Sequence, residues 1–224
     1  MQKRRIRNII WDWNGTLLND MVICIECMNT LLNKRSMPQL SSDHYREVFT
    51  FPVRDYFLQI GFDFTTEDFE VPAVEFVDLY NSKYEDAFLF PEARGTLHHF
   101  RNQGFNQYIL SAQEKSLLIK LIRFYEIEKY FSGITGITDN FAESKIEAGK
   151  QMMEELLLVP EETVMVGDTV HDYEVSEALG ISCLLISHGH QSAERLGMTG
   201  APVIDSYFEI EEYLNHNMNR VSRT

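Results

Sequence analysis

The apolar residues along the chain predict short buried strands that alternate with helices. Four continuous apolar runs end in small or polar residues: 8–13, 106–110, 163–166 and 182–186. Stretches with helical periodicity follow them, and this alternation is typical of a parallel sheet that is covered by helices on both faces. We therefore predict an α/β fold with a Rossmann-like core. In such sheets the reactive groups gather at the carboxyl ends of the strands, so the polar residues that follow these runs are the candidates for chemistry.

The segment between the first and second predicted strands has a different pattern. Its apolar residues recur at helical spacing in four stretches: 21–32, 42–50, 53–60 and 71–84. Because an all-helical insert beside the end of a strand is suited to act as a lid, we predict that it forms a separate cap. The predicted division is an α/β core of residues 1–18 and 91–224 and a helical cap of residues 19–90.

The composition narrows the set of partners. The chain has 224 residues and a formal net charge of −14, with an isoelectric point of about 4.9. Nucleic acids and anionic membranes require a cationic surface, so we expect neither as a partner. No apolar run in the sequence approaches the roughly 18 residues of a membrane-spanning helix, and a cytoplasmic location is the expectation. The sequence leaves the oligomeric state open.

The three cysteines do not indicate a disulfide framework, because an odd number cannot all pair. Cys24 and Cys27 form a C-x-x-C pattern, which is compatible with a redox or metal site. The pair lies within an apolar helical stretch, however, and no second C-x-x-C follows it in the sequence. We therefore expect both side chains to pack inside a helical core.

Acidic residues stand at the ends of two predicted strands. Asp12 ends the first run, Asp168 follows the third, and Asp172 lies one helical turn after Asp168. Three carboxylates that converge on one pocket repel one another unless a hard cation joins them, and Mg²⁺ with oxygen ligands fits this requirement. Asp12, at the end of a buried strand, is also a candidate nucleophile.

Two further residues complete the groups that phosphoryl transfer requires. Lys145 precedes Asp168 by one helix and its connection to a strand, where its charge would offset a phosphate and orient Asp12. Ser111 offers a hydroxyl donor at another strand end. Each residue alone has an ordinary explanation as a turn, a helix cap or a surface charge. Together, a carboxylate nucleophile, a metal, a lysine and a hydroxyl favour phosphoryl transfer.

These residues also carry a family resemblance. The chain resembles the haloacid dehalogenase-like hydrolase superfamily, near its phosphoglycolate phosphatase branch. The four motifs of that superfamily match at Asp12, Gly15, Thr16 and Leu17, at Ser111, at Lys145, and at Gly167, Asp168 and Asp172. The helical insert lies where that branch carries its cap, so the resemblance implies the same division into core and cap.

The resemblance implies a Mg²⁺-dependent phosphatase that acts on a small phosphorylated metabolite such as phosphoglycolate. Asp12 would attack the phosphorus and form an aspartyl-phosphate. The phosphoryl oxygens would be bound by Thr16, Ser111 and Lys145. The Mg²⁺ ion would be held by Asp12, the backbone carbonyl of Asn14 and Asp168, with Asp172 binding through water or supporting these ligands.

Asn14 departs from the family pattern. The family places an aspartate there, which protonates the leaving oxygen and then activates water. A carboxamide keeps the volume and the backbone metal contact, but it cannot exchange a proton. General acid–base catalysis is worth about 10²–10⁴-fold, so we expect slow turnover that favours good leaving groups. His171 and the pair His188 and His190 are candidates for another proton source, with a surface or supporting role as the alternative for each.

Two other functions are compatible with the motifs. A dehalogenase-type hydrolase also lacks a carboxylate at the position of Asn14, but it dispenses with the metal, and the acidic pair Asp168 and Asp172 favours phosphate over halide. A degenerate member would bind phosphate or a partner without turnover. In the predicted cap, Arg54 is a candidate contact for a substrate anion, with a solvated arginine at a helix start as the alternative.

Overall fold

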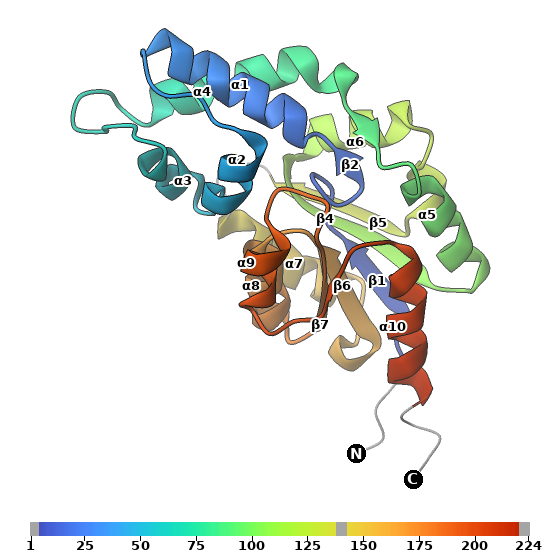
Figure 1. Cartoon of the computed structure of the whole chain (residues 1–224). Coiled ribbons are helices and arrows are strands. Elements are labelled where there is room, and N and C mark those ends of the chain that lie inside the picture. The colour runs from blue at the N-terminus through green and yellow to red at the C-terminus, as the bar shows by residue number, and fades with distance from the viewer. Residues whose placement is uncertain (1–4, 138–142, 220–224) are drawn as a thin grey trace.

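The computed structural model describes residues 5–137 and 143–219 and confirms the predicted α/β fold (Figure 1). Within these residues a six-stranded sheet, parallel throughout, has the strand order β5-β4-β1-β6-β7-β8. The strands are β1 Asn8–Trp11, β4 Asn106–Glu114, β5 Gly133–Ile137, β6 Thr163–Gly167, β7 Ser182–Ile186 and β8 Val203–Ile204. The first predicted strand therefore lies near the centre of the sheet, between the strands that carry Ser111 and lead to Asp168.

Helices cover both faces of the sheet, because alternate residues of the central strands point to opposite sides. Ile10 and Met165 pack with side chains of helices α7 (Glu143–Glu155) and α8 (Val170–Leu179). Their neighbours Ile9 and Val164 belong to the larger apolar core. That core includes side chains of three further helices: α5 Ala93–Asn102, α6 Lys115–Phe124 and α10 Phe208–Asn219. A short helix, α9 (Ala193–Gly197), lies against β8.

The insert after β1 is helical, as predicted. Its helices are α1 Met21–Lys34, α2 Ser42–Val48, α3 Val53–Gln59 and α4 Glu70–Lys83. They lie together at one end of the sheet (Figure 1), and their side chains share a cavity with Asp12. A two-stranded antiparallel ribbon of β2 (Leu18–Asn19) and β3 (Phe88–Leu89) connects this insert to the core. The ribbon stands beside the predicted division at residues 18 and 91, which stays a prediction.

Helix α1 accounts for the C-x-x-C pattern. Cys24 and Cys27 both lie on this helix, and both are buried free thiols, so the expectation of helix packing is confirmed. Burial raises the pKa of both thiols above the ordinary value, which disfavours the reactive thiolate. None of the helices in the described ranges has the length and apolar character needed to cross a membrane.

Two predicted strand ends differ from the structure. The first apolar run extends to residue 13, but β1 ends at Trp11 because the chain turns there. The Trp13 carbonyl accepts hydrogen bonds from the N–H groups of Leu17 and Leu18 at 2.9 Å, and these bonds close the turn. Ser111 was expected after the end of its strand, whereas β4 continues to Glu114.

Candidate active site

The register of the central strands brings the predicted reactive groups to one edge of the sheet. Trp11 pairs with a residue of β4 on one side and with Val166 of β6 on the other. Asp12 continues from β1, and its backbone N–H donates to the Val166 carbonyl over 2.9 Å. Ser111 and Asp168 stand two residues beyond the positions that pair with Trp11. All three polar side chains are buried, because this edge lies under the cap.

Lys145 joins two of the carboxylates. Its ammonium group lies 2.5 Å from Asp12 Oδ1 and 2.6 Å from Asp172 Oδ1, and all three side chains are buried. Burial raises the pKa of Asp12 to about 8, with Lys145 opposing the rise and Asp172 and Asp168 adding to it. Burial would lower the pKa of Lys145, but the two carboxylates raise it above the ordinary value. The lysine is therefore held as a cation that orients the candidate nucleophile.

The acidic cluster suits a divalent cation. Ligand oxygens of Asp12, Asp168 and Asp172 all lie within 4.8 Å of one another. Lys145 contacts two of these three buried carboxylates, and burial raises the pKa of Asp168 to about 6, so a further cation is needed for all three to ionise together. An all-oxygen donor set of this charge matches the chemistry of Mg²⁺. The residues present thus fit the predicted metal.

Asp172 also caps the helix on which it stands. Its Oδ2 accepts hydrogen bonds from the backbone N–H groups of Asp168 and Thr169 at 3.1 and 3.0 Å, and Thr169 in turn caps the start of α8. Burial would raise the pKa of Asp172, but Lys145 and Thr169 lower it below the ordinary value. Asp172 therefore both caps helix α8 and belongs to the acidic cluster.

Asp168 is fixed by two donors from different loops. Thr16 Oγ1 donates to Asp168 Oδ1 over 2.9 Å, and the His190 backbone N–H donates to Asp168 Oδ2 over 2.6 Å. Gly15 lies against the same carboxylate with φ of 75°, and a Cβ there would overlap Asp168 Oδ2 and His190 Cδ2. Only glycine allows this close approach in a left-handed conformation. The turn after the nucleophile is thus shaped around Asp168.

The side-chain amide of Asn14 is hydrogen-bonded on the side of the cap, and an amide cannot transfer a proton as a carboxyl group would. Its Nδ2 donates to Asp20 Oδ2 over 2.7 Å and to the Tyr80 hydroxyl over 2.9 Å. Tyr80, on α4, itself donates to Asp20 Oδ2 over 2.8 Å. The departure from the family pattern is therefore built into a closed set of hydrogen bonds, in which an amide is needed as donor.

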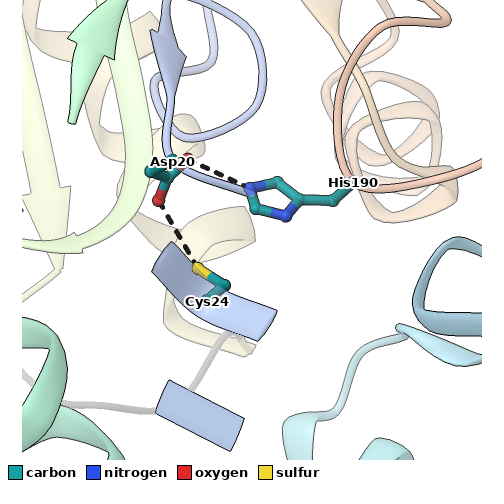
Figure 2. A group of neighbouring side chains, drawn as sticks. All are labelled: Asp20, Cys24 and His190. Carbon is teal, nitrogen blue, oxygen red and sulfur yellow. Dashed lines mark hydrogen bonds and ion pairs between the residues drawn. The ribbon is translucent and has the colours of Figure 1, made fainter. Parts of the chain in front are cut away.

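Asp20, which no sequence motif singled out, lies at the centre of this network. Figure 2 shows the buried Asp20 side chain between His190 and Cys24. His190 Nε2 lies 3.2 Å from Asp20 Oδ1, and Cys24 Sγ lies 3.6 Å from Asp20 Oδ2. Burial opposes both charges, but His190 lowers the pKa of Asp20, and Asp20 raises the pKa of His190 to about 9. The two residues thus form a buried ion pair beside Asn14.

Asp20, Cys24 and His190 also present ligand atoms within 4.8 Å of one another. Both oxygens of Asp20 already accept hydrogen bonds, from the Gly15 N–H at 3.1 Å and from the groups named above. The second nitrogen of His190 lies 2.9 Å from the Tyr45 hydroxyl, on cap helix α2. This cluster is therefore a satisfied hydrogen-bond network rather than a set of open ligands.

The other two candidate histidines lie elsewhere. Among the three, only His190 contributes to the described lining of the cavity at Asp12. His171 is buried on α8, 3.3 Å from the exposed Glu174, with its ring against Phe51. His188 stacks on Phe90, with ring centroids 3.8 Å apart. Both arrangements match the supporting roles that the sequence analysis gave as alternatives.

The remaining predicted contacts divide into two groups. Ser111 lines the cavity, and because its Oγ accepts the Gln113 N–H at 3.0 Å, its hydroxyl hydrogen is left to donate. Thr16 is fully buried against Asp168 and does not line the described cavity. Arg54 is exposed, with its guanidinium 5.1 Å from the centre of the Phe64 ring, and it too is absent from that lining. The predicted phosphate contact of Thr16 and substrate contact of Arg54 stay predictions.

A cavity of about 730 Å³ lies between the core and the cap. Asp12, Ser111, Lys145 and Asp172 line its core side. Side chains of α1, α2, α3 and α4 line the cap side, together with Phe49 and Phe51 between α2 and α3. The candidate nucleophile therefore faces a partly open cavity of the size that holds a small organic ligand.

A sequence model of the family described as haloacid dehalogenase-like hydrolase matches residues 9–186. The chain therefore belongs to this hydrolase family, as the motifs predicted, and the matched part includes Asp12, Lys145 and Asp168 but not His190. Its α/β fold is that of the family's phosphatase structures. A predicted phosphatase from Clostridium acetobutylicum superposes with a TM-score of 0.82 at 18% identity, over 95% of this chain and 100% of that chain.

Two named relatives are distant in sequence and cover most of this chain. A phosphoglycolate phosphatase from Vibrio parahaemolyticus is 24% identical over 224 residues, which cover 95% of this chain and 97% of the relative. A protein named tyrosine-protein kinase PtkA, from Mycobacterium tuberculosis, is 23% identical over 210 residues, which cover 91% of this chain and 70% of the relative. The structure of that protein superposes with a TM-score of 0.80.

Proposed function

We propose that this protein is a Mg²⁺-dependent phosphomonoesterase that hydrolyses a small phosphorylated metabolite through an aspartyl-phosphate. The observation that carries the proposal is the position of Asp12, at the end of the central strand and 2.5 Å from the Lys145 ammonium group. The named phosphoglycolate phosphatase among its relatives supports the same chemistry. We expect the enzyme to act in the cytoplasm, where its three free cysteines would stay reduced.

In the proposed first step, a carboxylate oxygen of Asp12 attacks phosphorus, and the bond from phosphorus to the ester oxygen breaks. Lys145 and Ser111 hold the phosphoryl oxygens by donating hydrogen bonds. Water then attacks the same phosphorus, which releases inorganic phosphate and restores the Asp12 carboxylate. Asp12, Asp168, Asp172 and the Asn14 backbone carbonyl would hold Mg²⁺, which when bound supplies positive charge that offsets the phosphate and the clustered carboxylates.

The leaving oxygen needs a proton, and Asn14 cannot supply it. Its amide protons are directed to Asp20 and Tyr80, so the group is neither an acid nor free to become one. A missing general acid costs about 10²–10⁴-fold in rate, and the loss is greatest for poor leaving groups. We therefore expect slow hydrolysis of alkyl phosphates and faster hydrolysis of acyl or aryl phosphates.

Two alternatives are kept from the sequence analysis. A dehalogenase-type reaction would be independent of metal, and the buried cluster of three carboxylates argues against it. A member without turnover would bind phosphate or a partner, and the ion pair between Lys145 and Asp12 argues for chemistry instead. The relative named as a tyrosine kinase adds a third possibility, transfer of the phosphoryl group to an acceptor hydroxyl rather than to water.

The test is phosphate release from a panel of phosphomonoesters, measured with and without Mg²⁺. We expect release only with Mg²⁺, and none from Asp12→Asn, which keeps the shape of the side chain without its nucleophilic charge. Stabilisation by beryllium fluoride with Mg²⁺ would report the trapped aspartyl group. Halide release without metal would establish the dehalogenase alternative, and labelling of a tyrosine peptide by ATP would establish transfer. Ligand stabilisation with no product from any substrate would establish the binding alternative.

A further inference from the structure

We propose that the cavity selects phosphate esters of apolar, uncharged alcohols and disfavours esters that carry a second anionic group, phosphoglycolate included. This inference rests on the proposed phosphatase function, because it concerns the part of the substrate that is not the phosphate. The observations are the apolar cap side of the cavity and the distribution of charge around it.

The cap side of the cavity is built from aromatic and aliphatic side chains. Six of the aromatic and branched side chains on this side are half-buried, so part of their surface is available to a ligand: Phe49, Phe51, Val53, Phe69, Phe76 and Val77. Contact with such surfaces removes apolar area of a ligand from water, which is favourable by about 25 cal/mol per Å². An alcohol portion of the size of a phenyl or branched alkyl group would therefore gain affinity here, and a short polar one would not.

Cations are scarce around this space. Among the described residues that line the cavity, Lys145 is the only lysine or arginine, and its ammonium group is shared between Asp12 and Asp172. The chain segment 138–142, between the two described parts, contains no lysine or arginine in its sequence. A substrate carboxylate that reached beyond the phosphate would find no free basic side chain among these residues.

The other titratable groups that line the cavity do not offer a free positive charge to a second substrate anion. His190 uses one ring nitrogen on Asp20 and the other on the Tyr45 hydroxyl. Glu70 and Glu114 add negative charge to the lining. A second anion would thus be desolvated beside carboxylates without a partner, which is costly. The charge of the phosphate itself would be compensated, because the phosphate would lie at the edge of the sheet beside Lys145 and the proposed metal.

Two pairs of compounds test the inference. Hydrolysis of 2-phenylethyl phosphate is compared with hydrolysis of the same ester bearing a para-carboxylate, and with hydrolysis of phosphoglycolate. All three leaving groups are primary alcohols, so the missing proton donor affects them alike. We expect kcat/KM for the uncharged ester to exceed the other two by about tenfold or more, since burial of one apolar group is worth about 10–200-fold.

The matching phosphonates, in which CH2 replaces the ester oxygen, are 3-phenylpropylphosphonate and its para-carboxylate. They are titrated into the Mg²⁺-loaded protein by calorimetry, because phosphonates bind without turnover. Absence of phosphate release from every ester would refute the proposed function, while the phosphonate pair would still decide the substrate class. Tighter or equal binding of the carboxylated phosphonate would overturn the inference, and so would a preference for phosphoglycolate among the esters.

Two lysine substitutions on α4 provide matched variants. Val74 lines the cavity and is 56% exposed, whereas Val71, one turn earlier, is 48% exposed and lies outside the described lining. Val74→Lys supplies the missing cation, so we expect it to improve binding of the carboxylated phosphonate at least fivefold relative to the uncharged one. Val71→Lys makes the same change of charge outside the cavity, and we expect no shift. Equal responses of the two variants would overturn the argument from charge.

Discussion

The side-chain amide of Asn14 donates a hydrogen bond to the carboxylate of the buried Asp20, with 2.7 Å between nitrogen and oxygen. An aspartate at position 14 would place two carboxylates at this distance, where they cannot both ionise. The amide at position 14 and the acid at position 20 are therefore matched to each other. The departure from the family pattern involves a pair of residues rather than a single one.

This pairing predicts that Asn14→Asp by itself destabilises the protein. It also predicts that a carboxyl group at position 14 raises activity only when Asp20→Asn removes the second carboxylate. The single variant removes a buried hydrogen bond and opposes like groups, and we expect a loss of about 1–3 kcal/mol in the free energy of unfolding. The double variant restores an amide–carboxylate pair and places a carboxyl group two residues from the nucleophile. We expect it to hydrolyse an alkyl phosphate up to about 10²-fold faster than the natural protein, while loss of the buried ion pair between Asp20 and His190 keeps it less stable than the natural protein. Urea unfolding and phosphate release measure the two effects, and a single variant as stable as the natural protein would contradict the pairing.

Loss of Lys145 should affect stability as well as activity. Lys145→Ala leaves the buried carboxylates of Asp12 and Asp172 without their shared cation, and breaking a buried pair costs about 3–5 kcal/mol. The matched control is Lys150→Ala on the same helix, where the lysine is half-exposed and its pair with Glu147 is a surface one. We expect at most about 0.5 kcal/mol from the control in denaturant unfolding. Similar losses from both variants would show that the cluster does not depend on the ammonium group.

The cap should lose part of its stability in acid through Arg35. The Arg35 guanidinium contacts both Glu67 oxygens at 2.8 Å and Glu75 at 2.9 Å, and it holds the pKa of both carboxyls below their ordinary value of 4.5. A lowered pKa in the folded state gives stability that is present above the unfolded value and lost as the pH falls through the folded one. We therefore expect Arg35→Gln to be less stable than the natural protein at pH 7, and the difference to shrink below about pH 4.5.

Lys34→Gln is the control for this experiment, because its ammonium group is half-exposed and lies 3.4 Å from Glu75 alone. Exposed pairs of this kind contribute about 0–1 kcal/mol, so its effect should be the smaller at every pH. Urea unfolding of the three proteins between pH 3 and pH 7 gives the comparison. A difference for Arg35→Gln that stays constant over this range would exclude titration of the two glutamates as its source.

Two glycines with the same backbone requirement separate strain from crowding at the site. Gly15 and Gly104 have φ of 75° and 82°, but an added Cβ would overlap Asp168 only at Gly15 and would meet nothing within 4 Å at Gly104. Gly104→Ala should therefore cost about 1 kcal/mol from backbone strain alone. Gly15→Ala should cost distinctly more in thermal unfolding, and it should weaken the stabilisation by Mg²⁺ because Asp168 must move. Equal losses would mean that the turn does not press on the metal cluster.

Local patterns were sufficient to predict four strands of the sheet and part of the site, but not β5 and β8. Asp12 and Asp168 could be placed because each follows a continuous apolar run, and parallel strands end at a common edge. Asp20 could not be found in this way, since an acid directly before an apolar helix is expected to serve as a cap. Its true partner, His190, is 170 residues away and comes from a loop, so only tertiary packing reveals the ion pair. The same holds for Thr16, whose hydroxyl donates to Asp168 in the structure, whereas the motif predicts a phosphate contact.

Two phenol groups from the cap, Tyr80 of α4 and Tyr45 of α2, take part in the hydrogen bonds around Asp20 and His190. A displacement of the cap that moves α2 and α4 away from this network breaks these bonds, and the buried ion pair then loses Tyr80 as a donor to Asp20 and Tyr45 as the partner of His190. The free energy of opening is thus set in part by the acid–amide pair beside the nucleophile. Cap closure and the order of the turn around Asn14 are therefore thermodynamically linked. A ligand that stabilises the closed cap also stabilises this turn, and a change that disorders the turn weakens the binding of that ligand.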